Sequence, residues 1–365
     1  VQKERMDMSP ATNVLLRGHY DTLGDKVAAE TPEALHAFPE GAPRNRLGLA
    51  QWLVDPANPL TARVTVNRFW QEIFGRGLVP TSEDFGVMGT PPSHPQLLDW
   101  LAIEFQSNGW DVKEFFKLML MSATYRQSAT VTAEKIEKDR DNAWLSRGPR
   151  FRMDAEMIRD YALATSGLLS AQMYGPGTRP YQPTNIWEVV GLPGGNTRKY
   201  VQDKGENLYR RSVYNFWKRM APPPNLEAFN APSREVCAVR RERTNTPLQA
   251  LVTLNDPQFV EAARVLAEQA MLEARQRPDS VSAEKLIVDE IARRALGRSF
   301  TPVEERLVLQ NQQKLRDHYA SHAEAAEKLL SVGEAPPAKD LSPVELAAWT
   351  LVCNQVLNLD EVLNK

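Results

Sequence analysis

The chain has 365 residues, of which 42% are hydrophobic and 25% are charged, and its formal net charge at pH 7 is -2. These values are ordinary for a globular protein and exclude a wholly disordered chain, while the near-neutral charge excludes a general attraction to nucleic acid. No stretch has the length and apolarity of a membrane-spanning helix.

Residues 1–44 are rich in proline, glycine and short polar side chains, and we expect them to form an extended N-terminal segment. Residues 13–17 and 26–29 suit β-strands, and the Gly24-Asp25 step between them predicts a loose hairpin. The first ten residues include neither an initiator Met nor the apolar core of a signal peptide. We therefore expect this start to be the interior of a longer protein.

Residues 45–171 show apolar side chains at helical spacing and predict an N-terminal helical lobe. Short polar residues precede the apolar runs, and Gly75 and Gly109 follow two of them, as helix caps do. The expected N-caps are Thr61, Ser93, Asp111 and Asp154.

Residues 172–245 are dense in glycine, proline and aromatic side chains and predict a long irregular segment that covers a site or packs on the helical body. Within it, residues 210–219 alternate between the two sides of an extended chain and predict one isolated strand.

Residues 246–365 predict a C-terminal helical lobe that begins with Thr246 as N-cap and Pro247 at the first helical position, breaks near Asp256-Pro257 and ends with a helix over 343–357. The predicted fold is therefore mainly α, a multi-helical body with a long irregular segment rich in glycine, proline and aromatics and a few short strands. The two lobes can also form one domain.

Five long blocks then resemble, in order, the signatures of one family. They are RVTVNRFWQEIFGRGLVPTSEDFG, PPSHPQLLDWLA, GWDVKEFFKLMLMSATYRQS, RRSVYNFWKR and RTNTPLQALVTLND. The family is the C-terminal "domain of unknown function 1553" of planctomycete-type cytochrome c proteins. The resemblance covers nearly all of the chain after about residue 40.

This resemblance implies a periplasmic or extracellular parent protein in which an upstream cytochrome c domain, the expected partner, carries a c-type haem. The chain itself contains two cysteines, Cys237 and Cys353, and neither lies in a CxxCH motif, so we expect no haem or other cofactor here. Both cysteines are expected to be small buried hydrophobes. The family supplies no catalytic residues.

Arginines gather around the irregular segment, at positions Arg210, Arg211, Arg234, Arg240, Arg241 and Arg243. Because a guanidinium binds carboxylate, sulfate or phosphate through a planar fork, the cluster suits an anionic sugar or an organic acid. The alternative, which we favour, is an internal network of ion pairs with Glu206, Glu235 and Glu242.

Aromatic side chains of the same segment form a second candidate site, because their faces stack on sugar rings. They are Tyr174, Tyr181, Trp187 and Tyr200. The alternative, again favoured, is packing of the loop on the helices. The residues that we predict to contact a ligand are Tyr181, Trp187, Arg211, Trp217, Arg240, Arg241 and Arg243.

Three further constellations have a more ordinary explanation. Glu83 and Asp84 resemble an acid–base pair beside Asn67 and Arg68, but neighbouring side chains diverge, so loop hydrogen bonds are expected. His318 and His322 have metal-ligand spacing in a polar, solvated stretch, so no metal site is expected. His94 suits a proton shuttle or an axial haem ligand, but its place predicts a helix start.

The leading functional hypothesis is an accessory or substrate-engaging module of a cell-envelope c-type cytochrome protein, acting on or near polysaccharides, with glycans as ligands. One alternative is the substrate pocket of a haem-dependent oxidoreductase, and another is a scaffold that docks the upstream cytochrome domain. The sequence has no phosphate-binding glycine loop, nucleophile elbow or zinc-protease helix, and it leaves open whether the domain is catalytic.

Overall fold

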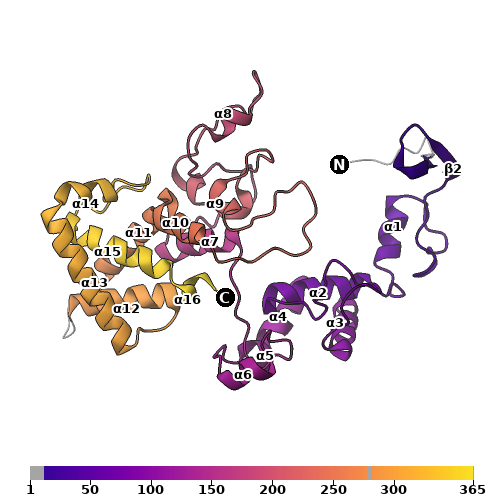
Figure 1. Cartoon of the computed structure of the whole chain (residues 1–365), viewed down its shortest axis with the longest axis horizontal. Helices are drawn as coiled ribbons and strands as arrows, with labels where there is room; N and C mark the ends of the chain where they lie inside the picture. The colour runs from indigo at the N-terminus through magenta and orange to yellow at the C-terminus, as the bar shows by residue number, and fades with distance from the viewer. Residues whose placement is uncertain (1–11, 278–281, 365) are drawn as a thin grey trace. The chain divides into compact units, whose positions relative to one another are not determined.

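The computed structural model describes residues 12–277 and 282–364, which are mainly helical, as predicted (Figure 1). They divide into two compact units that meet in the chain at Pro149 and Arg150. Within the described ranges, strands pair only in one two-stranded sheet, and no helix is long and apolar enough to cross a membrane.

The first unit begins with the predicted hairpin, in which β1 (Thr12–Leu15) pairs with β2 (Leu23–Val27) in antiparallel register. The expected turn position is wrong, because Gly24 lies inside β2 and the chain reverses over a 3-10 turn, Leu16–Gly18. The Asn13 side chain donates to the Gly24 carbonyl at 2.8 Å, which fastens the two strands.

The helical part of this unit has one apolar core in which α2, α3 and α4 share aromatic side chains. Trp70, Phe105 and Phe115 are almost fully buried there. Its helices are α1 (Arg46–Leu53), α2 (Thr61–Phe74), α3 (Pro95–Ser107), α4 (Val112–Met121), α5 (Ala123–Arg126) and α6 (Ala133–Lys138).

Two of the expected caps in this unit are wrong by a residue or more. The Asn58 side chain, not Thr61, accepts the first amide hydrogens of α2, from Leu60 at 3.0 Å and Thr61 at 3.1 Å. The N-cap position of α3 is His94 and not Ser93, with no side-chain cap bond. Asp111 caps α4 as predicted and accepts from the Lys113 amide at 2.9 Å.

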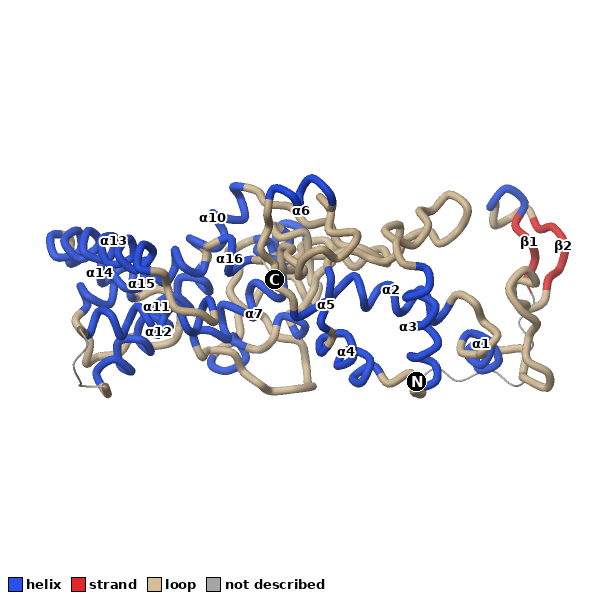
Figure 2. Tube along the Cα trace, turned by 90° about the horizontal axis from the view of Figure 1, so that it is seen from below, coloured by secondary structure: helices blue, strands red, loops and turns tan. Residues whose placement is uncertain are grey.

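The second unit is a helical bundle built around α11, as both views of the chain show (Figures 1 and 2). Its longer helices are α7 (Ala155–Ser166), α10 (Pro247–Asn255), α11 (Pro257–Arg275), α12 (Ala283–Leu296), α13 (Pro302–Ser321), α14 (Ala323–Leu330) and α15 (Pro343–Leu357). Alanines of α11 and α15 are fully buried, which lets these helices approach closely. Three short helices complete the unit: α8 (Ile186–Val190), α9 (Pro224–Glu227) and α16 (Asp360–Leu363).

Helix α7 lies in this second unit, whereas the sequence places it in the N-terminal lobe that ends at residue 171. The reason is its apolar face, since Ile158 and Ala162 are buried in the same core as α11. The division after Pro149 therefore differs from the predicted boundary between residues 171 and 172.

The irregular segment is present, but the strand predicted over residues 210–219 is wrong. This stretch holds a 3-10 turn, Ser212–Tyr214, and its strand-like pairing is limited to isolated bridges. Side chains of α7 form hydrogen bonds with polar groups of this stretch that would otherwise pair with a neighbouring strand. The Asp160 carboxylate accepts from both the amide and the hydroxyl of Ser212, at 2.8 and 2.7 Å.

Candidate functional site

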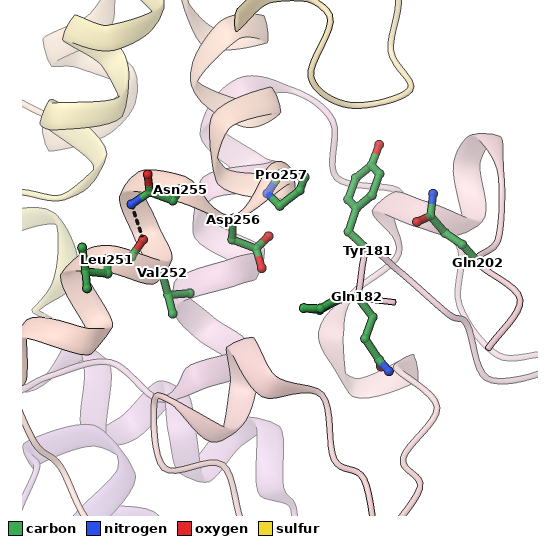
Figure 3. A pocket seen from close by; sticks show the side chains of 9 residues that line it. Tyr181, Gln182, Gln202, Leu251, Val252, Asn255, Asp256 and Pro257 are labelled. Atoms are coloured by element: carbon green, nitrogen blue, oxygen red, sulfur yellow. Dashed lines mark hydrogen bonds between the residues drawn. The ribbon is translucent and has the colours of Figure 1, made fainter. Parts of the chain in front are cut away.

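A pocket of about 580 Å³ lies in the second unit, between the irregular segment and the corner at which α10 meets α11 (Figure 3). One wall comes from the irregular segment and consists of Tyr181, Gln182, Pro183 and Gln202. The opposite wall comes from the helix corner and consists of Leu251, Val252, Asn255, Asp256 and Pro257. The pocket thus joins two stretches of chain that are far apart in the sequence.

Asp256 is the carboxylate of the corner wall, and it serves two helices at once. It ends α10 and is the N-cap of α11, where its side chain accepts from the Gln258 amide at 3.1 Å. Burial raises the pKa of Asp256, while bonds from Gln258 and Asn225 and the charge of Arg159 oppose that shift. In Figure 3 its carboxylate points into the space between the two walls.

The wall of the irregular segment is held from behind by the loop between α14 and α15, residues 331–342, which we call the α14–α15 loop. The Glu334 amide donates to the Tyr181 hydroxyl at 2.7 Å, and the Gln202 side chain donates to the Glu334 carboxylate at 3.0 Å. The Tyr181 hydroxyl is engaged with this loop, so the ring is what it offers to the pocket. The Gln182 side-chain nitrogen is buried and has no hydrogen-bond partner among the described residues.

The α14–α15 loop in turn rests on a charged group inside the bundle. Glu261 is fully buried, and its carboxylate accepts from the Tyr209 hydroxyl at 2.9 Å and the Ala335 amide at 2.7 Å. Buried Arg264 donates to Glu268 at 2.7 Å and to the Ala335 carbonyl at 2.5 Å. Burial, with the nearby Glu261 charge, raises the pKa of Tyr209 to about 12, so this phenol stays a hydrogen donor.

A second buried arginine, Arg159 of α7, fixes the chain beneath the pocket. Its guanidinium donates to the carbonyls of Leu208 at 2.7 Å and Arg210 at 2.9 Å, and to the Gln258 side chain at 2.5 Å. Burial lowers the pKa of Arg159 to about 10, which leaves it charged at neutral pH. Arg159 therefore ties the irregular segment to the first turn of α11.

Three of the predicted arginines pair with carboxylates of α7 or of its N-cap residue, Asp154. Arg241 meets Glu156 at 2.5 Å, and Arg243 lies 3.9 Å from Asp154. Arg211 lies 3.9 Å from Asp160, further along α7. The ion-pair interpretation therefore describes these contacts. The acids in them belong to α7 and its N-cap, whereas the acids expected from the sequence are Glu206, Glu235 and Glu242.

Arg240 belongs to residues 233–243, which we call the arginine-rich loop, and its side chain is exposed. None of the four arginines predicted to contact a ligand lines the pocket at the α10–α11 corner. Their contact with a ligand remains a prediction. Trp217 donates from its ring nitrogen to the Ser233 carbonyl at 3.0 Å, and the Arg234 guanidinium lies 4.8 Å from its ring.

Of the predicted aromatic group, Tyr181 alone contributes to the pocket described above. Trp187 is 1% exposed, with ring centroids 5.0 Å from Tyr200 and 5.4 Å from Phe216. The Lys218 ammonium lies 5.0 Å from the same indole ring. Neighbouring groups thus cover the Trp187 ring, as the packing alternative predicts.

The histidines and acidic residues singled out in the sequence make contacts with their own neighbours in the fold. His318 and His322 stack with ring centroids 4.4 Å apart, and no group of three potential metal ligands occurs in the described part of the chain. His94 packs edge-on against Trp144 at 5.6 Å. The Asp84 carboxylate accepts from the Gly86 amide at 2.6 Å, which is the expected loop hydrogen bond.

The cysteines differ from each other. Cys353 is fully buried, as predicted, and burial raises the pKa of its thiol. Cys237 is exposed in the arginine-rich loop, so the expectation of burial is wrong there. It lies in an exposed loop and on no helix face.

Several residues that line or support the pocket lie in sequence patterns that predict secondary structure and do not by themselves indicate a binding site. The Asp256-Pro257 step indicates a break between helices, and this pattern does not single out the Asp256 carboxylate as part of a pocket. The charged residues Glu261, Arg264 and Glu268 follow one another at helical spacing within an otherwise apolar run, which is the signal of a buried polar group.

A comparison with protein families finds one match over most of the chain. The family model described as PSD1, "Protein of unknown function (DUF1553)", matches residues 45–311. No curated protein and no solved structure matches the chain.

Proposed function

The chain belongs to the PSD1 family of unknown function (DUF1553), and from that premise we propose that it is a substrate-engaging module that binds carbohydrate in the pocket at the α10–α11 corner. The setting that we propose is a cell-envelope c-type cytochrome protein, periplasmic or extracellular, whose upstream domain carries the haem. In this setting the module presents a glycan to, or holds it near, the redox part of the parent protein.

The observation that carries the proposal is the mixture of groups on the two pocket walls. Asp256 offers a hydrogen-bond acceptor, and Gln182 offers a buried amide nitrogen without a partner among the described residues. The Tyr181 ring and the apolar side chains of Val252 and Pro257 line the same pocket (Figure 3). A sugar ring has hydroxyl groups around its edge and C–H groups on its faces, so it can form hydrogen bonds with the polar groups and pack against the apolar ones.

The size of the pocket also suits such a ligand. A volume of about 580 Å³ lies within the range of ordinary small-molecule sites and is large enough for an oligosaccharide of a few sugar units. The Gln182 nitrogen has no partner among the described residues, so a ligand hydroxyl that it meets when the side chain turns towards the pocket supplies a hydrogen bond that the free protein lacks. Such a donor favours a polar ligand over an apolar one.

Titration calorimetry of the folded chain against neutral oligosaccharides tests the proposal. We expect binding by the wild type and a loss of roughly tenfold in affinity for Gln182→Ala, because one hydrogen bond is removed. Arg240→Gln, in the arginine-rich loop, is the matched control and should bind as the wild type does. Absence of binding to every oligosaccharide, or loss of binding only in the Arg240 variant, would contradict the proposal.

A second candidate function, docking of the upstream cytochrome domain, is favoured by the hairpin of the first unit. Its side chains Leu15, Leu16 and Leu23 are 44%, 49% and 61% exposed, an apolar surface that suits a protein partner. The test is association with the separately produced cytochrome domain. Leu23→Glu should weaken that association, and equal binding by wild type and variant would argue against a docking role.

A further inference from the structure

We infer that the pocket selects uncharged carbohydrate over uronic or sulfated carbohydrate, and that Asp256 is the residue that sets this preference. The inference rests on the proposed function and narrows its substrate class. It differs from the expectation that the arginines of the irregular segment bind an anionic sugar.

The charges on the pocket walls are the first support. Among the nine described residues that line the pocket, Asp256 is the only carboxylate, and none is a lysine or an arginine. A ligand carboxylate or sulfate would therefore approach a like charge with no lining cation to offset it. A hydroxyl group, in contrast, can donate to Asp256.

The nearest buried cation does not reverse this charge. Arg159 is 2% exposed, and its nitrogens already donate to protein acceptors around the irregular segment. It lies 3.6 Å from Asp160 and also acts electrostatically on Asp256. Arg159 is thus engaged inside the protein and does not line the pocket, where Asp256 remains without a cation beside it among the lining residues.

The helix ends at the corner do not attract an anion either. The negative end of α10 and the positive end of α11 meet at Asp256, so their partial charges offset one another. Pro257 has no amide hydrogen, and the Gln258 amide is bonded to the Asp256 side chain. The next two amides, of Phe259 and Val260, donate to the Asp256 carbonyl. The first-turn amides of α11 are thus occupied within the chain.

A purely structural role for Asp256 as the N-cap of α11 has a different consequence. Asparagine caps helices about as well as aspartate, so Asp256→Asn keeps the cap and removes only the charge. If Asp256 is only a cap, this variant should leave the ratio of affinities for neutral and anionic ligands unchanged. If Asp256 selects by charge, the ratio should fall.

The experiment uses pairs of probes that differ in charge, namely methyl-esterified tetragalacturonate against tetragalacturonate, and lactose against lactose 3′-sulfate. Calorimetry of the full chain is expected to show a preference for the neutral member on the order of 10- to 100-fold, from like-charge repulsion at a partly buried site. Asp256→Asn should reduce this preference to within about threefold, with little change in affinity for the neutral member. Asp340→Asn, which removes an exposed carboxylate outside the lining residues, should keep the full preference.

Equal or tighter binding of the charged member by the wild type would overturn the inference, and so would an undiminished preference in Asp256→Asn. Either result leaves carbohydrate binding itself intact. Failure of both members of every pair to bind contradicts the proposed function instead, so the two failures are distinguishable.

Discussion

Replacing Gly333 by alanine perturbs the pocket wall without touching a pocket residue. Gly333 lies in the α14–α15 loop with φ +92°, and a Cβ atom there would overlap Cδ and Oε1 of Glu261. Because Glu261 is fully buried, it has little room to turn away. The loop must therefore move, and the bonds that hold Tyr181 should weaken with it.

The expected loss of stability has two parts. An alanine at positive φ costs about 1 kcal/mol by itself. Displacing the loop from the Glu261 carboxylate removes the bond from the Ala335 amide and strains that from Tyr209, which adds about 2–3 kcal/mol for hydrogen bonds to a charged group. Gly333→Ala should thus lower the free energy of unfolding by about 3–4 kcal/mol.

Gly297→Ala is the matched control, because Gly297 has φ +69° and a Cβ atom at this position would meet open space, with nothing within 4 Å. Urea unfolding followed by circular dichroism should show a loss of about 1 kcal/mol for this variant. Hydrogen exchange at the Glu334 amide should become faster in Gly333→Ala and stay unchanged in the control. Equal losses of stability in the two variants would refute the contact between the loop and Glu261.

Three further predictions concern other parts of the chain. Under native conditions a thiol reagent should modify Cys237 rapidly and Cys353 only after unfolding, since burial protects Cys353 and raises its pKa; two rapidly reacting thiols would contradict this. Urea unfolding should show that Arg159→Met lowers the free energy of unfolding by about 3–5 kcal/mol and Arg211→Met by under about 1 kcal/mol. The reason is that the Arg159 side chain is buried and the Arg211 side chain is half-exposed. Similar losses in the two variants would argue against the buried network around Arg159. A hydrogen bond from the Arg298 side chain lowers the pKa of Glu304 from 4.5 to about 2, so the contribution of Glu304 to stability is present above pH 4.5 and is lost as the pH falls towards 2. Glu304→Gln should flatten the curve of unfolding free energy against pH in this range. A curve that is the same in the variant and the wild type would contradict the pairing.

Features that depend on neighbouring residues were predictable from the sequence. Asp111 and Thr246 cap their helices because a short polar side chain reaches amides two or three residues away. The last long helix, Pro343–Leu357, has the predicted bounds because proline starts it and apolar side chains recur along its whole length. Gly75, at φ 80°, ends α2 as expected.

Features that depend on distant contacts were not predictable. Residues 210–219 alternate as a strand does, yet Arg159 and Asp160 bind this stretch from α7, about 50 residues earlier in the chain. The pocket likewise combines Tyr181 with Asp256, and no local pattern connects these two positions. The ion pairs of Arg211 with Asp160 and of Arg241 with Glu156 likewise join distant positions that no local pattern connects.

The central claim is that carbohydrate binds at the α10–α11 corner, and chemical-shift mapping of the isotope-labelled chain with neutral oligosaccharides tests it most directly. We predict that backbone and side-chain amide shifts concentrate at residues 181–183, 202 and 251–257 and include the Gln182 side chain. Shifts that concentrate at residues 240–243, or no shifts at any ligand concentration, would contradict the claim.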